Sequence, residues 1–139
     1  MISLSSRYAL RALAYLAHQK GVALSKEIAE ELSISPTYLT KILQTLRKAR
    51  ILKATRGAKG GFVLDRDPSK VTFIEIISLF EDPKDWFACP FGQVVCKGDP
   101  KIICKLHCKW EKLSQSFSKF LSQATVSEIS RVHSPQRIS

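Results

Sequence analysis

One stretch of the chain, residues 25–64, restricts the fold more than any other, because two short helices, a tight turn and a hairpin follow one another there in a fixed order. The turn lies at residues 33–36. Ser35 is expected to cap the helix that follows, and Pro36 suits its first position, where a missing backbone N–H costs nothing. Two short helices joined in this way are typical of a helix-turn-helix motif.

The helix that begins at Pro36 is predicted to bury one face and to expose a polar one. Apolar residues recur at the helical period and form the buried stripe, which consists of Leu39, Ile42, Leu43 and Leu46. The opposite face offers hydroxyl, amide and cationic side chains without a carboxylate, as expected of the helix that enters the DNA major groove. An ordinary amphipathic helix is the alternative. The candidate DNA-binding residues here are Ser35, Thr37, Tyr38, Thr40, Lys41, Gln44, Arg47 and Lys48.

A hairpin with a glycine-rich tip is predicted to follow this helix. Apolar residues 51–52 and 62–64 flank the loop Arg56-Gly57-Ala58-Lys59-Gly60-Gly61, whose glycines allow positive φ and close approach to another molecule. The hairpin therefore reads as the wing of a winged helix, with Arg56 and Lys59 placed to reach a minor groove or its phosphates. A nucleotide-binding loop is disfavoured, because the Gly-Lys-Ser/Thr ending of that motif is missing and no helix begins there.

The distribution of charge supports double-stranded DNA as the partner. The formal net charge is +10, and residues 1–64 carry 11 Lys and Arg against 3 Asp and Glu, whereas residues 65–139 carry 11 against 9. A one-signed basic stripe is what phosphate binding requires, although a solvated surface is the alternative for any charge run. Charged residues interrupt the first twenty positions, so neither a signal peptide nor a membrane span is expected, and the predicted location is cytoplasmic.

The remaining elements follow from apolar periodicity and capping residues. Capping boxes are expected at Thr72 with Glu75 and at Thr125 with Glu128. The expected elements are, in chain order, a helix at residues 4–17, a short helix capped by Ser25, the helix from Pro36, the hairpin, a fourth helix that ends before Asp82-Pro83, an irregular loop at residues 84–103, a long helix at about residues 104–123 and a short last helix.

The long helix carries a bulky apolar stripe that needs a partner. Its members alternate spacings of four and three, the pattern of a helix–helix seam. The seam either packs within its own chain or forms a homodimer, and the homodimer is favoured because helix-turn-helix proteins usually read two half-sites. The candidate dimer-interface residues are Leu106, Trp110, Leu113, Phe117 and Phe120.

The predicted fold is mainly α. Residues 1–68 form a winged helix-turn-helix DNA-binding domain with a two-stranded wing. Residues 69–132 hold the fourth helix, a cysteine-rich loop and a long dimerisation helix, and residues 133–139 are a flexible tail.

All four cysteines, Cys89, Cys96, Cys104 and Cys108, fall within the second of these regions. Without an export signal, a reducing compartment and thiolate chemistry are the starting expectation. Positions 104, 107 and 108 can share one face of a starting helix, so His107 joins the candidate metal ligands. Zinc is an alternative, but the spacing lacks the paired short chelates of zinc ribbons. A thiol switch is the stronger alternative, because four nearby lysines favour thiolates: Lys97, Lys101, Lys105 and Lys109.

Several motifs together carry a family resemblance. They are Ser35-Pro36-Thr37-Tyr38-Leu39, Leu46-Arg47-Lys48, Thr55-Arg56-Gly57, Gly60-Gly61-Phe62, and Cys104 with His107 and Trp110. Over nearly its whole length the chain resembles the Rrf2 family of bacterial winged-helix regulators, especially the IscR-like and NsrR-like members. The resemblance implies a homodimer that binds a partly palindromic operator and controls transcription according to the state of an iron–sulfur cluster or of its thiols.

The same resemblance implies that Cys89, Cys96 and Cys104 ligate the cluster. In the IscR-like branch a histidine three residues after the last cysteine is the fourth ligand, which matches His107. NsrR-like members use an acidic residue near the amino terminus of the other subunit, where this chain has Ser5, Ser6 and Arg7. The chain departs from the family by the additional Cys108 and by longer intervals between its first three cysteines.

An iron–sulfur cluster is therefore the expected cofactor, with 2Fe-2S favoured over 4Fe-4S if an imidazole completes the ligand set. The predicted function is a DNA-binding transcriptional regulator, with a clusterless thiol or disulfide switch as the alternative. A small electron carrier is disfavoured, because it would have no use for a basic recognition helix and wing. An enzyme is not expected, because catalytic triads, paired catalytic carboxylates and nucleotide motifs are missing from the sequence.

Overall fold

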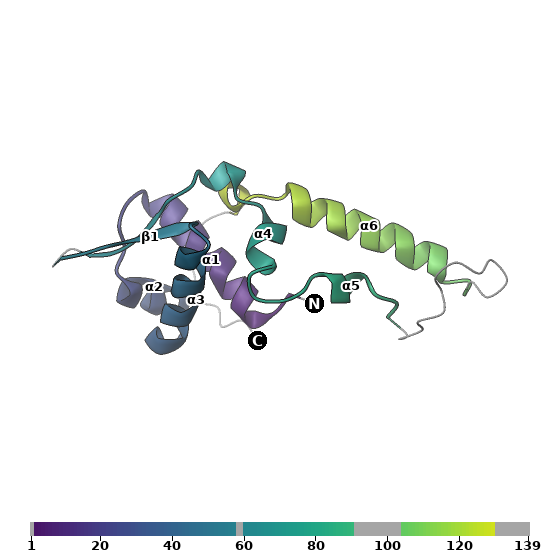
Figure 1. The fold of residues 1–139 in the computed structure, drawn as a ribbon, viewed down its shortest axis with the longest axis horizontal. Helices are drawn as coiled ribbons and strands as arrows, with labels where there is room; N and C mark the ends of the chain where they lie inside the picture. The colour runs from purple at the N-terminus through teal and green to yellow at the C-terminus, as the bar shows by residue number, and fades with distance from the viewer. Residues whose placement is uncertain (1, 58–59, 91–103, 130–139) are drawn as a thin grey trace.

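The computed structural model describes residues 2–57, 60–90 and 104–129 and confirms the predicted order of the first elements. Three helices, α1 (Leu4–Gln19), α2 (Ser25–Leu32) and α3 (Pro36–Lys48), lie together and are followed by two antiparallel strands, β1 (Leu52–Thr55) and β2 (Gly61–Leu64). Figure 1 shows the strands projecting away from the helices as a narrow hairpin. The chain is thus a mainly helical winged helix-turn-helix with a two-stranded wing, as the sequence predicts.

The two helix starts around the turn differ in how they are capped. The hydroxyl of Ser35 accepts a hydrogen bond from Tyr38 N at 3.4 Å, and Pro36 is the first residue of α3, as predicted. In contrast, Ser25 is itself helical, and Leu24 is the N-cap. The prediction of Ser25 as a cap was wrong, because the Glu27 carboxylate accepts from the Leu24 N–H at 2.9 Å and provides the polar oxygen that this helix start requires.

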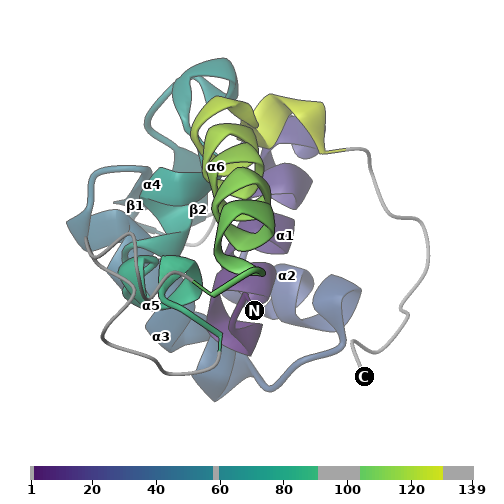
Figure 2. The ribbon, with the colours of Figure 1, turned by 90° about the vertical axis from the view of Figure 1, so that its right-hand side faces the viewer.

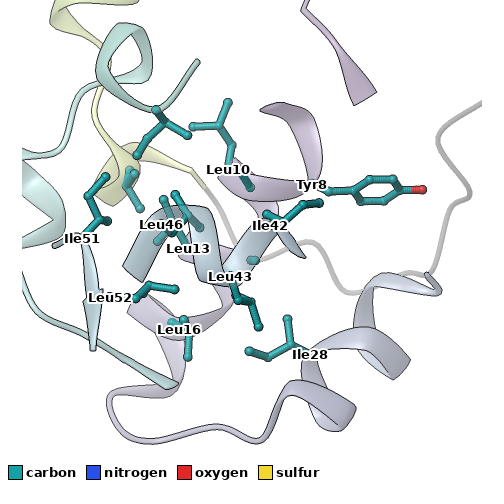
Figure 3. Packing of buried hydrophobic residues seen from close by; sticks show 14 of the residues in the cluster. Tyr8, Leu10, Leu13, Leu16, Ile28, Ile42, Leu43, Leu46, Ile51 and Leu52 are labelled. Carbon is teal, nitrogen blue, oxygen red and sulfur yellow. The ribbon is translucent and has the colours of Figure 1, made fainter. Parts of the chain in front are cut away.

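The apolar stripe of α3 lies at the centre of the molecule. Leu39, Leu43 and Leu46 are each fully shielded from solvent and belong to one core with Leu13 and Leu16 of α1. Figure 3 shows Leu43 and Leu46 within this core. Ile51 and Leu52, at the start of the wing, extend the same core. The recognition-helix candidate is therefore held by its buried face on a rigid platform, and its polar face remains outside.

The base of the wing is joined to the α1–α2 connection by a short β-bridge. In the wing itself Leu52 pairs with Leu64 and Thr55 pairs with Gly61. In the bridge, the Ala23 N–H donates to the Phe62 carbonyl at 2.9 Å, and the Phe62 N–H donates to the Ala23 carbonyl at 2.8 Å. These two bonds set the position of the wing relative to the helices, and they require β2 to approach Ala23 very closely.

We expect Gly61→Ala to destabilise the fold, because a Cβ at this position would overlap the Ala23 carbonyl oxygen and lie 2.7 Å from its carbonyl carbon. Both groups are backbone and cannot rotate away, so the expected loss is roughly 1–3 kcal/mol of unfolding free energy, as for other overpacked sites. Chemical denaturation measures it. Gly21→Ala is the matched control, since a Cβ there meets nothing within 4 Å. Equal stabilities of the two variants would contradict the prediction.

Beyond the wing, the chain forms η1 (Pro68–Lys70), α4 (Phe73–Ile77), α5 (Lys84–Phe87), α6 (His107–Gln123) and η3 (Val126–Glu128). The long helix α6 extends from the helical group on the side away from the wing (Figure 1). Figure 2 looks nearly along α6 and shows α4 and α1 behind it. The Thr125–Glu128 capping box is confirmed, with Glu128 Oε2 accepting from Thr125 N at 2.7 Å.

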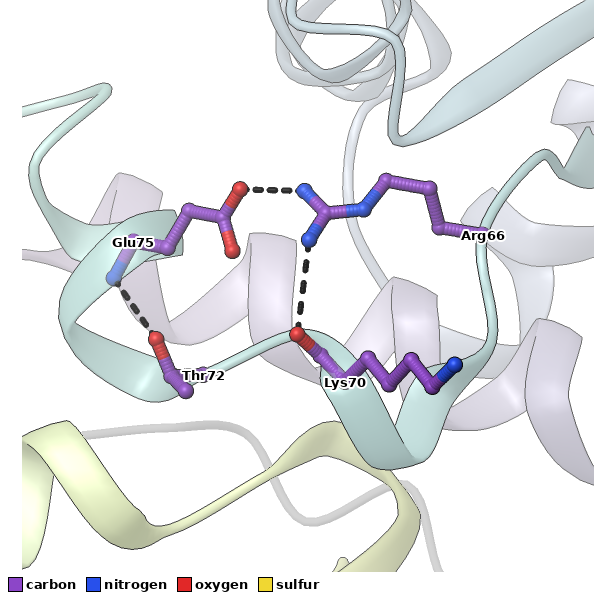
Figure 4. Close-up of polar contacts among 4 residues, drawn as sticks. All are labelled: Arg66, Lys70, Thr72 and Glu75. Carbon is purple, nitrogen blue, oxygen red and sulfur yellow. Dashed lines mark hydrogen bonds and ion pairs between the residues drawn. The ribbon is translucent and has the colours of Figure 1, made fainter.

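The other predicted capping box forms only in part. The Thr72 hydroxyl accepts from Glu75 N at 3.4 Å, as expected. The Glu75 carboxylate, however, pairs with the Arg66 guanidinium, which also donates to the Lys70 carbonyl at 3.3 Å (Figure 4). The expected bond from Glu75 back to the cap was wrong, because a charge-assisted bond with Arg66 takes its place.

Two boundaries near the cysteines also differ from prediction. Residues 84–87 form α5 rather than irregular loop, because Asp82 Oδ1 accepts from Lys84 N at 2.9 Å at the helix start. The long helix begins at His107 rather than at residue 104, and Cys104 lies in a preceding turn in which its carbonyl accepts from His107 N at 2.8 Å. The rest of the predicted loop, residues 91–103, and the predicted tail, residues 133–139, lie outside the described residues.

Candidate DNA interface and cysteine site

The polar face of α3 is exposed as a continuous surface. Thr37, Thr40, Lys41, Arg47 and Lys48 are exposed, and Gln44 is half-buried among them, while the leucines of the opposite face form the core. Separation of the two faces is what an amphipathic helix on a folded platform produces. The predicted DNA-binding residues of this helix thus lie on one surface, with Ser35 at its exposed start.

Some polar groups of this face already form hydrogen bonds within α3. Gln44 Oε1 accepts from Arg47 Nε at 2.8 Å. The Thr40 hydroxyl donates to the Pro36 carbonyl at 2.8 Å, and the Thr45 hydroxyl donates to the Lys41 carbonyl at 3.1 Å. Both threonines therefore use their hydrogens within the helix, and cationic and amide N–H groups remain to face a ligand.

Tyr38 differs from the other predicted residues of α3 because it is half-buried against α1. Its hydroxyl lies 2.7 Å from Ser5 Oγ, and its ring meets the ring of Tyr8 edge to face at a centroid distance of 5.9 Å. These contacts anchor the first turn of α3 on α1. Sequence reasoning missed Ser5 and Tyr8, because the helical period shows which face is apolar but not which residue of α1 meets Tyr38.

The wing presents Arg56 at its exposed end. Gly57 follows with φ of 107°, a conformation that favours glycine, and its carbonyl accepts from Gly60 N at 2.9 Å. Lys59 lies outside the described residues. Of the neighbouring cations, Lys53 Nζ lies 3.7 Å from Oδ1 of Asp65, the residue after β2, so part of its charge is offset. Arg56 is therefore the cation of the described wing that is best placed to reach a partner.

The three described cysteines lie in two places, one after α5 and the other around the start of α6. Cys89 is half-buried two residues beyond α5, whereas Cys104 and Cys108 are exposed, and His107 is half-buried between them. Cys96 lies outside the described residues. Within the described ranges, three or more Cys, His, Asp or Glu side chains are nowhere grouped closely enough to hold a metal. The donors nevertheless have the right chemistry, since thiolate and imidazole are the ligands that iron–sulfur centres accept.

The apolar stripe of α6 divides between its own chain and solvent. The Phe117 ring lies 5.9 Å from that of Trp86 and 6.3 Å from that of Phe87, both on α5, and Trp110 is half-buried. In contrast, Leu106, Leu113 and Phe120 are 46%, 61% and 53% exposed. Phe120 nevertheless meets the ring of Phe73 on α4 edge to face, at a centroid distance of 5.9 Å. The intrachain alternative thus accounts for part of the predicted seam, and three large apolar side chains remain partly exposed in the single chain.

Glu81, between α4 and α5, holds the amino-terminal turn of α1. Its Oε1 accepts from Ser3 N at 2.9 Å and from the hydroxyl of the fully buried Ser6 at 2.6 Å. Burial works to raise the pKa of Glu81, but the hydrogen bonds from Ser6 and Ser3 outweigh it and hold that pKa below its usual value. The sequence has no local signal for this contact, because Ser3 and Ser6 each lie more than seventy residues before Glu81.

Comparison with known proteins places this geometry among transcriptional regulators. The Rrf2 family model, described as an iron-dependent transcriptional regulator, matches residues 2–131. The HTH-type transcriptional regulator IscR of Xenorhabdus nematophila is 31% identical over 125 residues, which are 88% of this chain and 74% of that protein. None of the helices in the described ranges is both long and apolar enough to cross a bilayer.

Two solved structures extend the comparison to the fold. CymR of B. subtilis, titled the global cysteine regulator, superposes with a TM-score of 0.76 at 28% identity, covering 92% of this chain and 94% of that chain. IscR of T. potens superposes with a TM-score of 0.69 at 28% identity, covering 92% and 84% respectively. Both likenesses span the wing, the helical group and α6.

Proposed function

The chain belongs to the Rrf2 family of transcriptional regulators, and from that premise we propose that it is a homodimer whose operator binding follows an iron–sulfur cluster in its cysteine-rich segment. The observation that carries the proposal is the exposed cationic and amide face of α3 beside Arg56 of the wing, in a chain that also exposes the thiols of Cys104 and Cys108. Regulators of the family are not enzymes, and a cytoplasmic location is part of the proposal.

The DNA-binding part of the proposal assigns one groove to each exposed element. Side chains of α3 enter the major groove, where base edges differ in their hydrogen-bonding pattern. Arg56, with Lys59, contacts the adjacent minor groove or its phosphates. Tyr38 holds α3 at its angle on α1 through Ser5. Residues 1–68 thus bind the operator, which is partly palindromic because two copies of the chain read it.

The cofactor part assigns Cys89, Cys96 and Cys104 as three ligands and either His107 or Cys108 as the fourth. Three observations support this assignment: the donor types of these side chains, the family's character as iron-dependent regulators and the likeness to IscR proteins. When bound, an iron–sulfur cluster would supply one-electron redox chemistry and sensitivity to oxidants. The chain's own contribution is to present two exposed thiols, those of Cys104 and Cys108, around the start of α6.

The dimer part assigns α6 as the interface. Leu106, Leu113 and Phe120 recur every seven residues and are exposed in the single chain, so they offer a continuous strip to a second α6. Phe117, which packs against Trp86 of α5, and the half-buried Trp110 flank that strip. Two copies joined in this way carry two recognition helices, as a palindromic operator requires.

A clusterless thiol switch is the second candidate, and the exposure of Cys104 and Cys108 favours it. Exposed thiols beside lysines are readily oxidised, and a disulfide could then alter the segment before α6 without any metal. Measurement of iron and sulfide separates the two candidates.

We expect Lys41→Ala and Arg56→Ala each to weaken binding to a duplex from the chain's own promoter and to reduce the salt dependence of binding. Each loss of a phosphate contact makes the negative slope of log K against log salt less steep by about one. Fluorescence anisotropy across a salt series measures both effects. Lys70→Ala is the control, since Lys70 is an exposed cation on η1. A slope that is the same in Lys41→Ala, Arg56→Ala and the wild type would refute the assignment of these residues.

A further inference from the structure

We infer that Gln44 and Arg47 act as one hydrogen-bond-donating unit that reads guanine, in preference to adenine, at one position of each half-site. The inference rests on the proposed function and goes beyond it by naming the base that the recognition helix selects. It is carried by the bond between Gln44 Oε1 and Arg47 Nε, 2.8 Å long, on the exposed face of α3.

The chemistry of arginine fixes the orientation of the Gln44 amide. A guanidinium N–H can only donate a hydrogen bond, so the glutamine atom that faces Arg47 Nε must be the carbonyl oxygen. The amide NH₂ group therefore points away from Arg47 and offers two donors to whatever approaches the helix. Arg47 is exposed, and its two terminal nitrogens have no hydrogen-bond partner among the residues that the structure describes.

The same orientation disfavours the usual pairing of glutamine with adenine. That pairing needs the amide oxygen to accept from the adenine amino group while the amide NH₂ donates to N7. In this chain the oxygen already accepts from a cation, and an approaching amino hydrogen would meet the positive guanidinium at the same atom. The oxygen keeps a second lone pair, but the guanidinium beside it repels the positively polarised amino hydrogen, so adenine binds less well than guanine.

Guanine suits the pair because its major-groove edge presents two adjacent acceptors, N7 and O6. The Gln44 NH₂ can donate to one and an Arg47 terminal nitrogen to the other, which satisfies both groups without breaking the bond between them. The neighbouring side chains agree with this preference. Lys41 and Lys48 can only donate hydrogen bonds, as an edge with two acceptors requires.

Selection of duplexes from a randomised DNA pool by the full-length chain tests the inference. The wild type is expected to enrich guanine at one position per half-site. Gln44→Glu replaces the NH₂ by an acceptor, so that position should change to cytosine or adenine, whose amino groups donate in the groove. Arg47→Lys keeps the charge but removes the Nε–H, so it should free the amide oxygen of Gln44. The same position should then accept adenine as well as guanine.

A second measurement probes the contacted atom directly. Replacing the selected guanine by 7-deazaguanine removes the N7 acceptor and should weaken wild-type binding roughly tenfold, within the range of one bidentate contact. The loss should be smaller in Gln44→Glu, which has already lost one of the two donors to the guanine edge. Thr45→Ala is the control, because the Thr45 hydroxyl bonds within α3 to the Lys41 carbonyl.

The outcomes separate the inference from the proposed function. If the wild type enriches no sequence at all, both fail. The inference alone is overturned if the chain enriches a defined site but neither Gln44→Glu nor Arg47→Lys changes any base preference. It is also overturned if the wild type selects adenine, not guanine, at the position whose preference changes in Gln44→Glu. Unchanged binding to the 7-deazaguanine duplex would likewise overturn it.

Discussion

Purified without oxygen, the wild-type chain is expected to absorb visible light and to contain iron and acid-labile sulfide, whereas Cys104→Ala is expected to contain neither. Cys104 is one of the three thiols assigned as ligands, and an alanine offers no donor in its place. Because Cys104 is exposed and precedes α6, its removal should leave the fold intact. Absorption spectroscopy with iron and sulfide analysis measures the loss, and circular dichroism verifies the fold.

His107→Ala and Cys108→Ala, prepared in parallel, identify the fourth ligand. Loss or instability of the cluster in only one of them assigns that residue, and a histidine ligand should also make cluster stability depend on pH, because protonation competes for the imidazole. His18→Ala is the control, since His18 lies far from the cysteines in sequence and its Nε2 is 2.8 Å from the Ile129 carbonyl oxygen. Colourless, iron-free wild-type protein whose DNA binding still responds to peroxide would support the thiol switch instead.

Leu113→Glu is expected to convert the chain into a monomer and to abolish tight operator binding. Leu113 is 61% exposed in the single chain, so the substitution should not disturb the fold. In the proposed dimer it would bury two carboxylates in an apolar seam, which costs far more than one such interface can offset. Since a monomer loses the second half-site, affinity should fall by about 100-fold or more.

Gln115→Glu is the matched control for this change. It adds the same carboxylate to α6 at another exposed position, two residues away and outside the apolar stripe. Analytical ultracentrifugation gives the oligomeric state, and anisotropy gives the affinity. A Leu113→Glu protein that sediments as a dimer would show that α6 does not form the interface through this strip.

Local sequence signals predicted the elements whose capping and packing partners are near in sequence. Ser35 and Pro36 place the start of α3, and the apolar period of that helix identifies its buried face, because both depend on residues within two turns. The same rules misplaced the start of α2 and the bond of Glu75. At α2 the Glu27 carboxylate, not the Ser25 hydroxyl, meets the helix start, and the Glu75 carboxylate pairs with Arg66 rather than with the nearer Thr72 backbone.

The candidate site was predictable only in its parts. Composition and period indicate which side chains of α3 are polar and outside, yet the anchoring of Tyr38 by Ser5 depends on tertiary packing between α1 and α3. Likewise, the stripe of α6 reads as one seam in sequence. The structure divides it, because α5, which the sequence predicts as loop, supplies Trp86 and Phe87 to cover Phe117.

The amino-terminal turn of α1 has contacts in two directions. Ser3 and Ser6 bond Glu81, which lies on the path from α4 to the cysteines, while Ser5 bonds Tyr38 at the start of α3. If Glu81 moves and keeps its hydrogen bonds to Ser3 and Ser6, the first turn of α1 must move with it. Through the Ser5–Tyr38 hydrogen bond, that movement reaches the start of α3. Mechanical communication between the thiol end of the molecule and its DNA-facing end would need to cross only one turn of helix.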